Sequence, residues 1–126
     1  MPRIPLISIV DDDDALRNSL ENLIRSAGLR AQSFSSAEAF LSSNHAHDTR
    51  CLVLDVRMPG MSGPELQRQM AVANSHLPII LITAHADDAQ RTQALEAGAV
   101  AFLHKPFYEG ELLKAINAAL NHSRCV

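Results

Sequence analysis

Short apolar runs recur along the chain, separated by stretches that have the periodicity of amphipathic helices. Five runs are predicted to be β-strands, at residues 6–10, 31–34, 51–54, 79–83 and 101–104. The runs are continuous rather than alternating in hydrophobicity, which is usual for strands of a parallel sheet covered by helices on both faces. The chain is therefore expected to form a parallel sheet between two layers of helices.

Apolar residues at helical spacing predict five helices in the remaining segments. The first begins near Asp14 and is stopped by Gly28, the third starts at about Ser62, and the fifth follows the last strand. The fourth, at about 87–97, carries mainly alanines with only Leu95 as a large anchor, so it should be loosely held. Strand and helix alternate five times, which predicts a right-handed doubly wound α/β fold.

The second helix has a distinct start signal. Ser35 and Glu38 have the spacing of a capping box, in which a serine side chain and a glutamate side chain bond the first free N–H groups of a helix. Ala39, Phe40 and Leu41 follow and are expected to supply its buried side.

Composition and charge exclude several classes of protein. The 126 residues are 47% hydrophobic and 20% charged, which predicts one globular domain over residues 1–126. No apolar run approaches the roughly 18 residues of a membrane span, and aspartates stand where a signal peptide would need small residues, so a cytoplasmic chain is expected. The net charge of −3, with scattered basic residues, argues against nucleic-acid binding.

Cys51 and Cys125 have no metal-site or redox spacing. Cys51 is expected to be a core thiol and Cys125 a tail residue.

Polar side chains stand at the carboxyl ends of four predicted strands. The run Asp11–Asp14 follows the first strand, Asp55 the third, Thr83 ends the fourth, and Lys105 follows the fifth. In an open α/β sheet these ends form the crevice in which ligands bind. We therefore expect the four positions to contribute to one site.

Each position also has a simpler explanation when it is taken alone. Aspartates cap helices, which is the favoured role for Asp13–Asp14, while Thr83 can cap its own turn and Lys105 can be a surface lysine. Capping explains Asp11–Asp12 less well, because both come directly off a buried strand. The joint placement of all these residues favours a common site.

The acidic residues predict a metal. Two carboxylates about 4 Å apart repel each other by on the order of 4 kcal/mol at an effective dielectric constant of about 20, so Asp11, Asp12 and Asp55 need a positive partner. Mg²⁺ binds hard oxygen ligands and readily accepts a phosphate oxygen. Lys105 adds a fixed positive charge, and Thr83 a hydroxyl donor for a phosphate oxygen. The pattern indicates a magnesium site that handles a phosphoryl group.

These motifs, in this order and spacing, resemble the receiver domain of bacterial two-component response regulators over nearly the whole chain. The matching segments are Ile9–Asp12, Leu54–Gly63, Ile82–Ala84, Gly98–Ala99 and Lys105–Phe107. The residues around Asp55, Thr83 and Lys105 look closest to the FixJ-like regulators of transcription. The resemblance implies a flavodoxin-like (CheY-like) fold with five parallel strands in the order 2-1-3-4-5 and five helices.

The resemblance implies a role for each acidic residue. Asp55 would accept a phosphoryl group from a sensor histidine kinase. Asp12 and Asp55 would bind Mg²⁺ through their side chains and Arg57 through its backbone carbonyl, with Asp11 acting mostly through a bound water. The chain would be a phosphoacceptor switch rather than a turnover enzyme, with at most self-catalysed phosphorylation and dephosphorylation.

The resemblance also implies how the switch works. Lys105 would contact the phosphoryl oxygens, and its bond to Pro106 is expected to be cis. Thr83 would move toward the phosphate and Phe102 would turn inward into the vacated space. The surface formed by the fourth helix and fifth strand would change, creating a candidate homodimer interface. DNA would be reached only through an output domain outside this chain.

Three other interpretations fit parts of the pattern. A flavodoxin-like redox protein shares the architecture, but its flavin phosphate sits in a hydroxyl- and glycine-rich loop where this chain has four aspartates. An aspartyl phosphatase also uses a strand-end aspartate and magnesium, but it needs an acid–base aspartate where Arg57 stands. A degenerate receiver would act only by binding, yet all the expected acidic, hydroxyl and lysine positions are filled.

Overall fold

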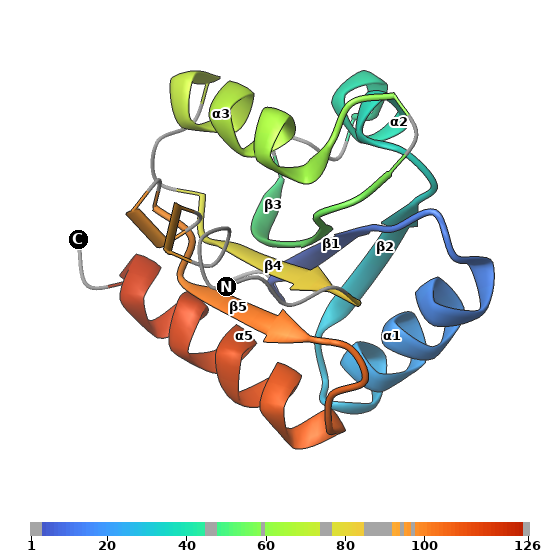
Figure 1. The fold of residues 1–126 in the computed structure, drawn as a ribbon. Helices are drawn as coiled ribbons and strands as arrows, with labels where there is room; N and C mark the ends of the chain where they lie inside the picture. Colours follow the sequence, from blue (N-terminus) through green and yellow to red (C-terminus); the bar gives the residue numbers. More distant parts are fainter. Residues whose placement is uncertain are drawn as a thin grey trace.

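The computed structural model describes residues 4–44, 48–58, 60–73, 77–84, 92–93, 95–96 and 98–124. At its centre lies a five-stranded parallel sheet in the order β2-β1-β3-β4-β5 (Figure 1). The strands are β1 (Leu6–Val10), β2 (Arg30–Phe34), β3 (Thr49–Asp55), β4 (Ile79–Thr83) and β5 (Ala101–His104). The predicted sheet and its order are confirmed, although β2 and β3 are longer than the apolar runs that predicted them.

The structure describes four helices, which lie on both faces of the sheet (Figure 1). They are α1 (Asp14–Ser26), α2 (Ala37–Ser42), α3 (Gly63–Ala73) and α5 (Glu109–Arg124). The expected helix at 87–97 lies largely outside the described residues, of which 92, 93, 95 and 96 are helical. Leu95 is 43% exposed, so the prediction that it anchors this helix in the core is wrong. Within the described part of the chain, no helix has the length and apolar character needed to cross a membrane.

The continuous apolar runs are explained by a core on each side of the sheet. Successive strand residues point to opposite faces, so Ile9 packs with α1 and α5 while its neighbour Val10 packs with α2 and α3. The α1/α5 side is completed by Leu20, Ile24, Leu112 and Ile116, and the α2/α3 side by Phe40, Leu66 and Met70.

Cys51 is fully buried, and burial raises the pKa of its thiol to about 12. It is the expected core thiol, while Cys125 lies outside the described residues.

Helix α1 begins and ends where the sequence predicts. The Asp13 carboxylate caps it, accepting hydrogen bonds from the N–H groups of Ala15 at 3.0 Å and Leu16 at 3.2 Å. This confirms the capping role favoured for Asp13. Gly28 ends the helix with a φ of 87°, a left-handed conformation that glycine adopts without steric cost.

The start of α2 differs from the prediction, which placed the cap one residue too early. The Ser36 hydroxyl accepts the hydrogen bond from Ala39 N–H at 3.0 Å. Glu38 does not complete a capping box, because its Oε2 atom accepts a hydrogen bond from the N–H of Met61 at 3.1 Å. Ala39 was expected on the buried side of the helix but is exposed, and Ala37 is buried instead. The predicted capping box is wrong because Glu38 bonds the loop between β3 and α3.

Candidate functional site

The carboxyl ends of four neighbouring strands bring the candidate residues to one edge of the sheet. Asp11 and Asp12 follow β1, Asp55 ends β3, Thr83 ends β4 and Lys105 follows β5. These strands are consecutive in the sheet, so their ends meet at one place. A carboxylate oxygen from each of the three aspartates lies within 4.8 Å of the others. The predicted acidic cluster is therefore present.

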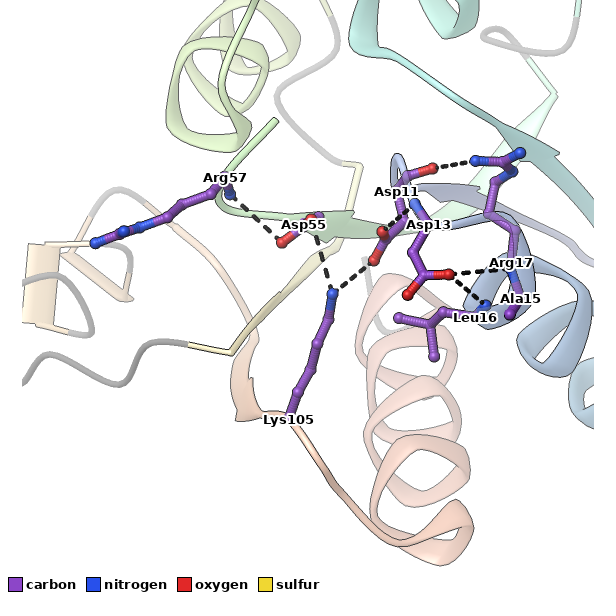
Figure 2. A network of polar contacts seen from close by, with 8 residues as sticks. All are labelled: Asp11, Asp13, Ala15, Leu16, Arg17, Asp55, Arg57 and Lys105. Atoms are coloured by element: carbon purple, nitrogen blue, oxygen red, sulfur yellow. Dashed lines mark hydrogen bonds and ion pairs between the residues drawn. The ribbon is translucent and has the colours of Figure 1, made fainter. Parts of the chain in front are cut away.

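Asp11 is fully buried, and each of its polar atoms has a partner. Its N–H donates to the carbonyl of Phe34 at 3.2 Å, and its Oδ1 accepts from the N–H of Asp13 at 2.9 Å. Its Oδ2 accepts from Lys105 Nζ at 2.8 Å, and its carbonyl accepts from Arg17 Nη1 at 2.7 Å (Figure 2). Asp11 therefore has a fixed position and orientation.

The Asp55 carboxylate is held much more loosely than that of Asp11. Its Oδ1 lies 3.4 Å from the Arg57 N–H nitrogen, and its Oδ2 lies 3.7 Å from Lys105 Nζ (Figure 2). Both distances exceed those of an ordinary N–H···O hydrogen bond. Burial raises the pKa of Asp55 to about 6, and the negative charge of Asp11 adds to this, while Lys105 and the Arg57 N–H act in the opposite direction. Asp55 is thus a carboxylate of raised basicity whose described contacts are all weak.

Lys105 reaches the site from the loop after β5. Its N–H donates to the carbonyl of Thr83 at 2.7 Å, which extends the pairing of β5 with β4. Its side chain then turns toward both buried aspartates and lies closer to Asp11 than to Asp55. The Lys105–Pro106 peptide bond is cis, as expected.

The remaining predicted residues occupy less central positions. Thr83 is buried at the end of β4, at the same edge as Asp55. Phe102 is partly buried and packs against the core on the α2/α3 side. The Arg57 side chain extends away from Asp55, and only its backbone N–H faces the carboxylate (Figure 2). The structure brings Thr83 to the site, while the switch roles of Thr83 and Phe102 stay predictions.

Three residues that shape the site were not predicted from the sequence to do so. Arg17 bonds the Asp11 carbonyl, and Glu38 bonds the loop after β3. Gly63 lies so close to Asp55 that an added Cβ would be 2.4 Å from the Asp55 carbonyl oxygen. Arg17 could have been identified from its position four residues after the cap Asp13. Helical side chains tilt toward the N-terminus of their helix, so a residue at this position can reach the segment before α1. The contacts of Glu38 and Gly63 depend on how α2 and α3 pack, for which the sequence carries no local signal.

A groove adjoins the acidic cluster on the α1/α5 side of the sheet and has a volume of about 440 Å³. One wall comes from α1, with Leu16, Ser19 and Leu20, and the other from the segment Lys105–Phe107. Most of the surface that lines it is apolar. The groove is therefore an apolar surface directly beside the acidic cluster.

Residues 7–117 match the family described as the response regulator receiver domain. The chain is 47% identical over 119 residues to nodulation protein W of Bradyrhizobium diazoefficiens, covering 94% of this chain and 52% of that protein. It is 40% identical over 123 residues to the transcriptional regulatory protein FixJ of Azorhizobium caulinodans, covering 98% of this chain and 58% of that protein. The chain therefore spans about half the length of these curated relatives.

Comparison with solved structures likewise identifies a response regulator. The fold superposes on the response regulator StyR with a TM-score of 0.88 and 45% sequence identity, covering 97% of this chain and 62% of that chain. The sequence similarity and the fold similarity thus extend over nearly the same part of the chain.

Proposed function

Because the chain belongs to the response regulator receiver domain family, we propose that it is a switch in which Asp55 accepts a phosphoryl group in a magnesium-dependent reaction. The resemblance to FixJ-like regulators is confirmed by the identity to FixJ. Receiver domains of this family are signalling switches rather than classical enzymes, so the redox and phosphatase alternatives are set aside.

The observation that carries this proposal is the contrast between the two buried aspartates. Both oxygens of Asp11 accept short hydrogen bonds, whereas the contacts of the Asp55 oxygens to described residues are 3.4 and 3.7 Å long. A nucleophile needs a lone pair that can reach the substrate, and the long contacts of the Asp55 oxygens to described residues leave such lone pairs available. Asp55 therefore suits the role of acceptor, and Asp11 that of a fixed support.

The donor atoms at this edge fit a magnesium site. Asp11, Asp12 and Asp55 offer three carboxylate oxygens close together, and hard oxygen ligands of this kind suit Mg²⁺. The backbone carbonyl of Arg57 is proposed as a further ligand. Bound Mg²⁺ would offset the negative charge of the cluster and so let an anionic phosphoryl donor approach.

Phosphoryl transfer places simple demands on the residues of this chain. An oxygen of Asp55 forms a bond to phosphorus as the P–N bond to the donor histidine breaks, and the electron pair leaves with the imidazole nitrogen. Lys105 and Thr83 contact the phosphoryl oxygens, where positioning and charge supply most of the catalysis. Lys105 is already 3.7 Å from an Asp55 oxygen, so a small movement of its side chain would bring it into contact with a phosphoryl group on Asp55.

We propose the groove beside the site as the surface that meets the donor histidine kinase. A donor protein has to bring its phosphohistidine to the strand ends, and the groove offers apolar surface next to Lys105. Ser19 is exposed on its α1 wall, so Ser19→Arg should fill the groove without touching the acidic cluster. It should slow transfer from a histidine kinase and leave phosphorylation by acetyl phosphate unchanged.

The output of the switch is proposed to be transcription. FixJ is named as a transcriptional regulatory protein, and this chain covers only 58% of it. We propose that DNA is reached only through an output domain outside these residues. A homodimer through the surface of the fourth helix and β5 is the proposed readout of phosphorylation.

The metal requirement provides the experiment that tests this function. The protein is incubated with acetyl phosphate, with Mg²⁺ or with EDTA, and the phosphorylated fraction is measured on a phosphate-affinity gel. Phosphorylation should need Mg²⁺, and Asp12→Asn should require a higher Mg²⁺ concentration because one proposed ligand is weakened. Equal phosphorylation in EDTA would contradict the proposal.

A further inference from the structure

The side chain of Arg17 joins the two ends of the acidic segment Asp11–Asp14, which leads from the end of β1 into the first residue of α1. Its Nη1 donates to the backbone carbonyl of Asp11 at 2.7 Å (Figure 2). Its Nη2 pairs with the carboxylate of Asp14. The Arg17 side chain is only 15% exposed, although it lies on the first turn of α1. A planar guanidinium can hold two acceptors in a fixed geometry, which a lysine ammonium cannot do.

The carbonyl that Arg17 binds belongs to the peptide unit between Asp11 and Asp12. A peptide unit is planar, so fixing its carbonyl also fixes the nitrogen and the Cα atom of Asp12. The next peptide unit is fixed as well, because Asp13 N–H donates to Asp11 Oδ1 at 2.9 Å. Asp12 thus lies between two fixed peptides, and these set the direction in which its exposed carboxylate leaves the backbone.

We propose that Arg17 is a positioning residue that orients Asp12 toward the metal through the Asp11–Asp12 peptide. This inference rests on the proposed magnesium site. In this role Arg17 touches neither the metal nor the phosphoryl group, and it acts only through the backbone. Partners that orient metal ligands in this way commonly affect metal affinity by about 10- to 100-fold.

Two other roles for Arg17 make different predictions. If Arg17 acted only through its charge, removing that charge would leave the cluster more negative and Mg²⁺ would bind more tightly. If Arg17 only stabilised the fold, its loss would lower stability and leave Mg²⁺ affinity unchanged. Positioning alone predicts weaker binding, so the direction of the change separates the three roles.

Arg25 provides a matched control on the same helix. Its Nη2 donates to the carbonyl of Ala31 at 3.0 Å, so it also ties α1 to a backbone carbonyl, but at the last turn of the helix. Arg17→Met and Arg25→Met each remove one such bond and one positive charge. Only the first of these bonds involves the acidic cluster.

The test is the Mg²⁺ dissociation constant from isothermal titration calorimetry, together with the urea midpoint of each variant. Both variants should unfold at lower urea, and Arg17→Met alone should raise the dissociation constant by about tenfold or more. Should Arg17→Met fail to fold, Arg17→Lys keeps the charge and loses the two-point geometry, and it should bind Mg²⁺ severalfold more weakly.

Three results would overturn the inference. Tighter binding by Arg17→Met would assign the effect to charge, and an unchanged constant would leave only a structural role. An equal loss in Arg25→Met would show that any loosening of α1 weakens the site. A wild-type protein that bound no Mg²⁺ would overturn the metal site itself, which separates failure of the proposed function from failure of this inference.

Discussion

The ammonium group of Lys105 lies 2.8 Å from Oδ2 of Asp11, a residue with no exposed surface. This pair neutralises one buried carboxylate, while Asp55 has only the longer contact of 3.7 Å to the same ammonium group. Lys105 therefore has a structural role in the resting protein besides its proposed contact with the phosphoryl group. The two roles can be separated by experiment.

Lys105→Met should lower the free energy of unfolding by about 3 kcal/mol in the absence of Mg²⁺, because it leaves the buried Asp11 charge without its partner. Saturating Mg²⁺ should recover more stability in this variant than in the wild type. Urea unfolding measures both values. Lys114→Met, at an exposed position of α5, is the control and should change stability little. Equal stability of the two variants without Mg²⁺ would contradict the structural role.

Asp55 should make the metal-free protein less stable as the pH rises. Its pKa is raised from 3.8 to about 6 in the folded state, so the folded state binds more protons than the unfolded state between these values. The stabilisation is fully present below about pH 4 and is lost as the pH rises through about 6. The neutral variant Asp55→Asn should therefore be more stable than the wild type at pH 8 by about 1 to 3 kcal/mol, and the difference should vanish near pH 4.

Urea unfolding at several pH values without Mg²⁺ checks this prediction. Asp48→Asn, which removes an exposed carboxylate just before β3, is the control. A wild type that is more stable than Asp55→Asn at pH 8 would show that Asp55 is well stabilised as an anion.

Gly63→Ala should disturb the site from the start of α3. The added Cβ would lie 2.4 Å from the Asp55 carbonyl oxygen and 2.9 Å from Val56 Cα, and backbone atoms cannot move away easily. We expect a loss of about 1 to 3 kcal/mol in the free energy of unfolding and slower phosphorylation by acetyl phosphate. Gly110→Ala is the control, since its Cβ would meet no atom within 4 Å and should stabilise α5 by about 0.5 to 1 kcal/mol. Normal stability of Gly63→Ala would refute the close approach.

Thr83 is predicted to couple phosphorylation to the surface that includes β5. Thr83→Ala should still accept a phosphoryl group from acetyl phosphate, but amide exchange across 98–104 should change less on phosphorylation than in the wild type. Thr83→Ser keeps the hydroxyl and should restore the change. Hydrogen exchange with mass spectrometry measures this, and identical changes in all three proteins would argue against the coupling.

The elements that depend on a simple local pattern could be predicted from the sequence. Continuous apolar runs such as Ile79–Thr83 identified strands buried on both faces, and the sheet order then brought Asp11, Asp55 and Lys105 to one edge. The cap at Asp13 was also predictable, because the residue and its helix are adjacent in the sequence.

What could not be predicted depends on contacts between distant segments. Glu38 has the correct spacing for a capping box, but it bonds Met61, which lies 23 residues further along the chain. The preference of Lys105 for Asp11 over Asp55 is set by the path of a long side chain, on which the sequence gives no information. The exposure of Leu95 likewise depends on how its segment packs.

The role of Asp55 as phosphoryl acceptor is tested most directly by intact-mass spectrometry of the wild type and Asp55→Asn after incubation with acetyl phosphate and Mg²⁺. The wild type should gain the mass of one phosphoryl group, the gain should disappear when EDTA replaces Mg²⁺, and Asp55→Asn should gain none. A phosphoryl group on Asp55→Asn at the wild-type rate, or on neither protein, would contradict the assignment of Asp55 as the acceptor.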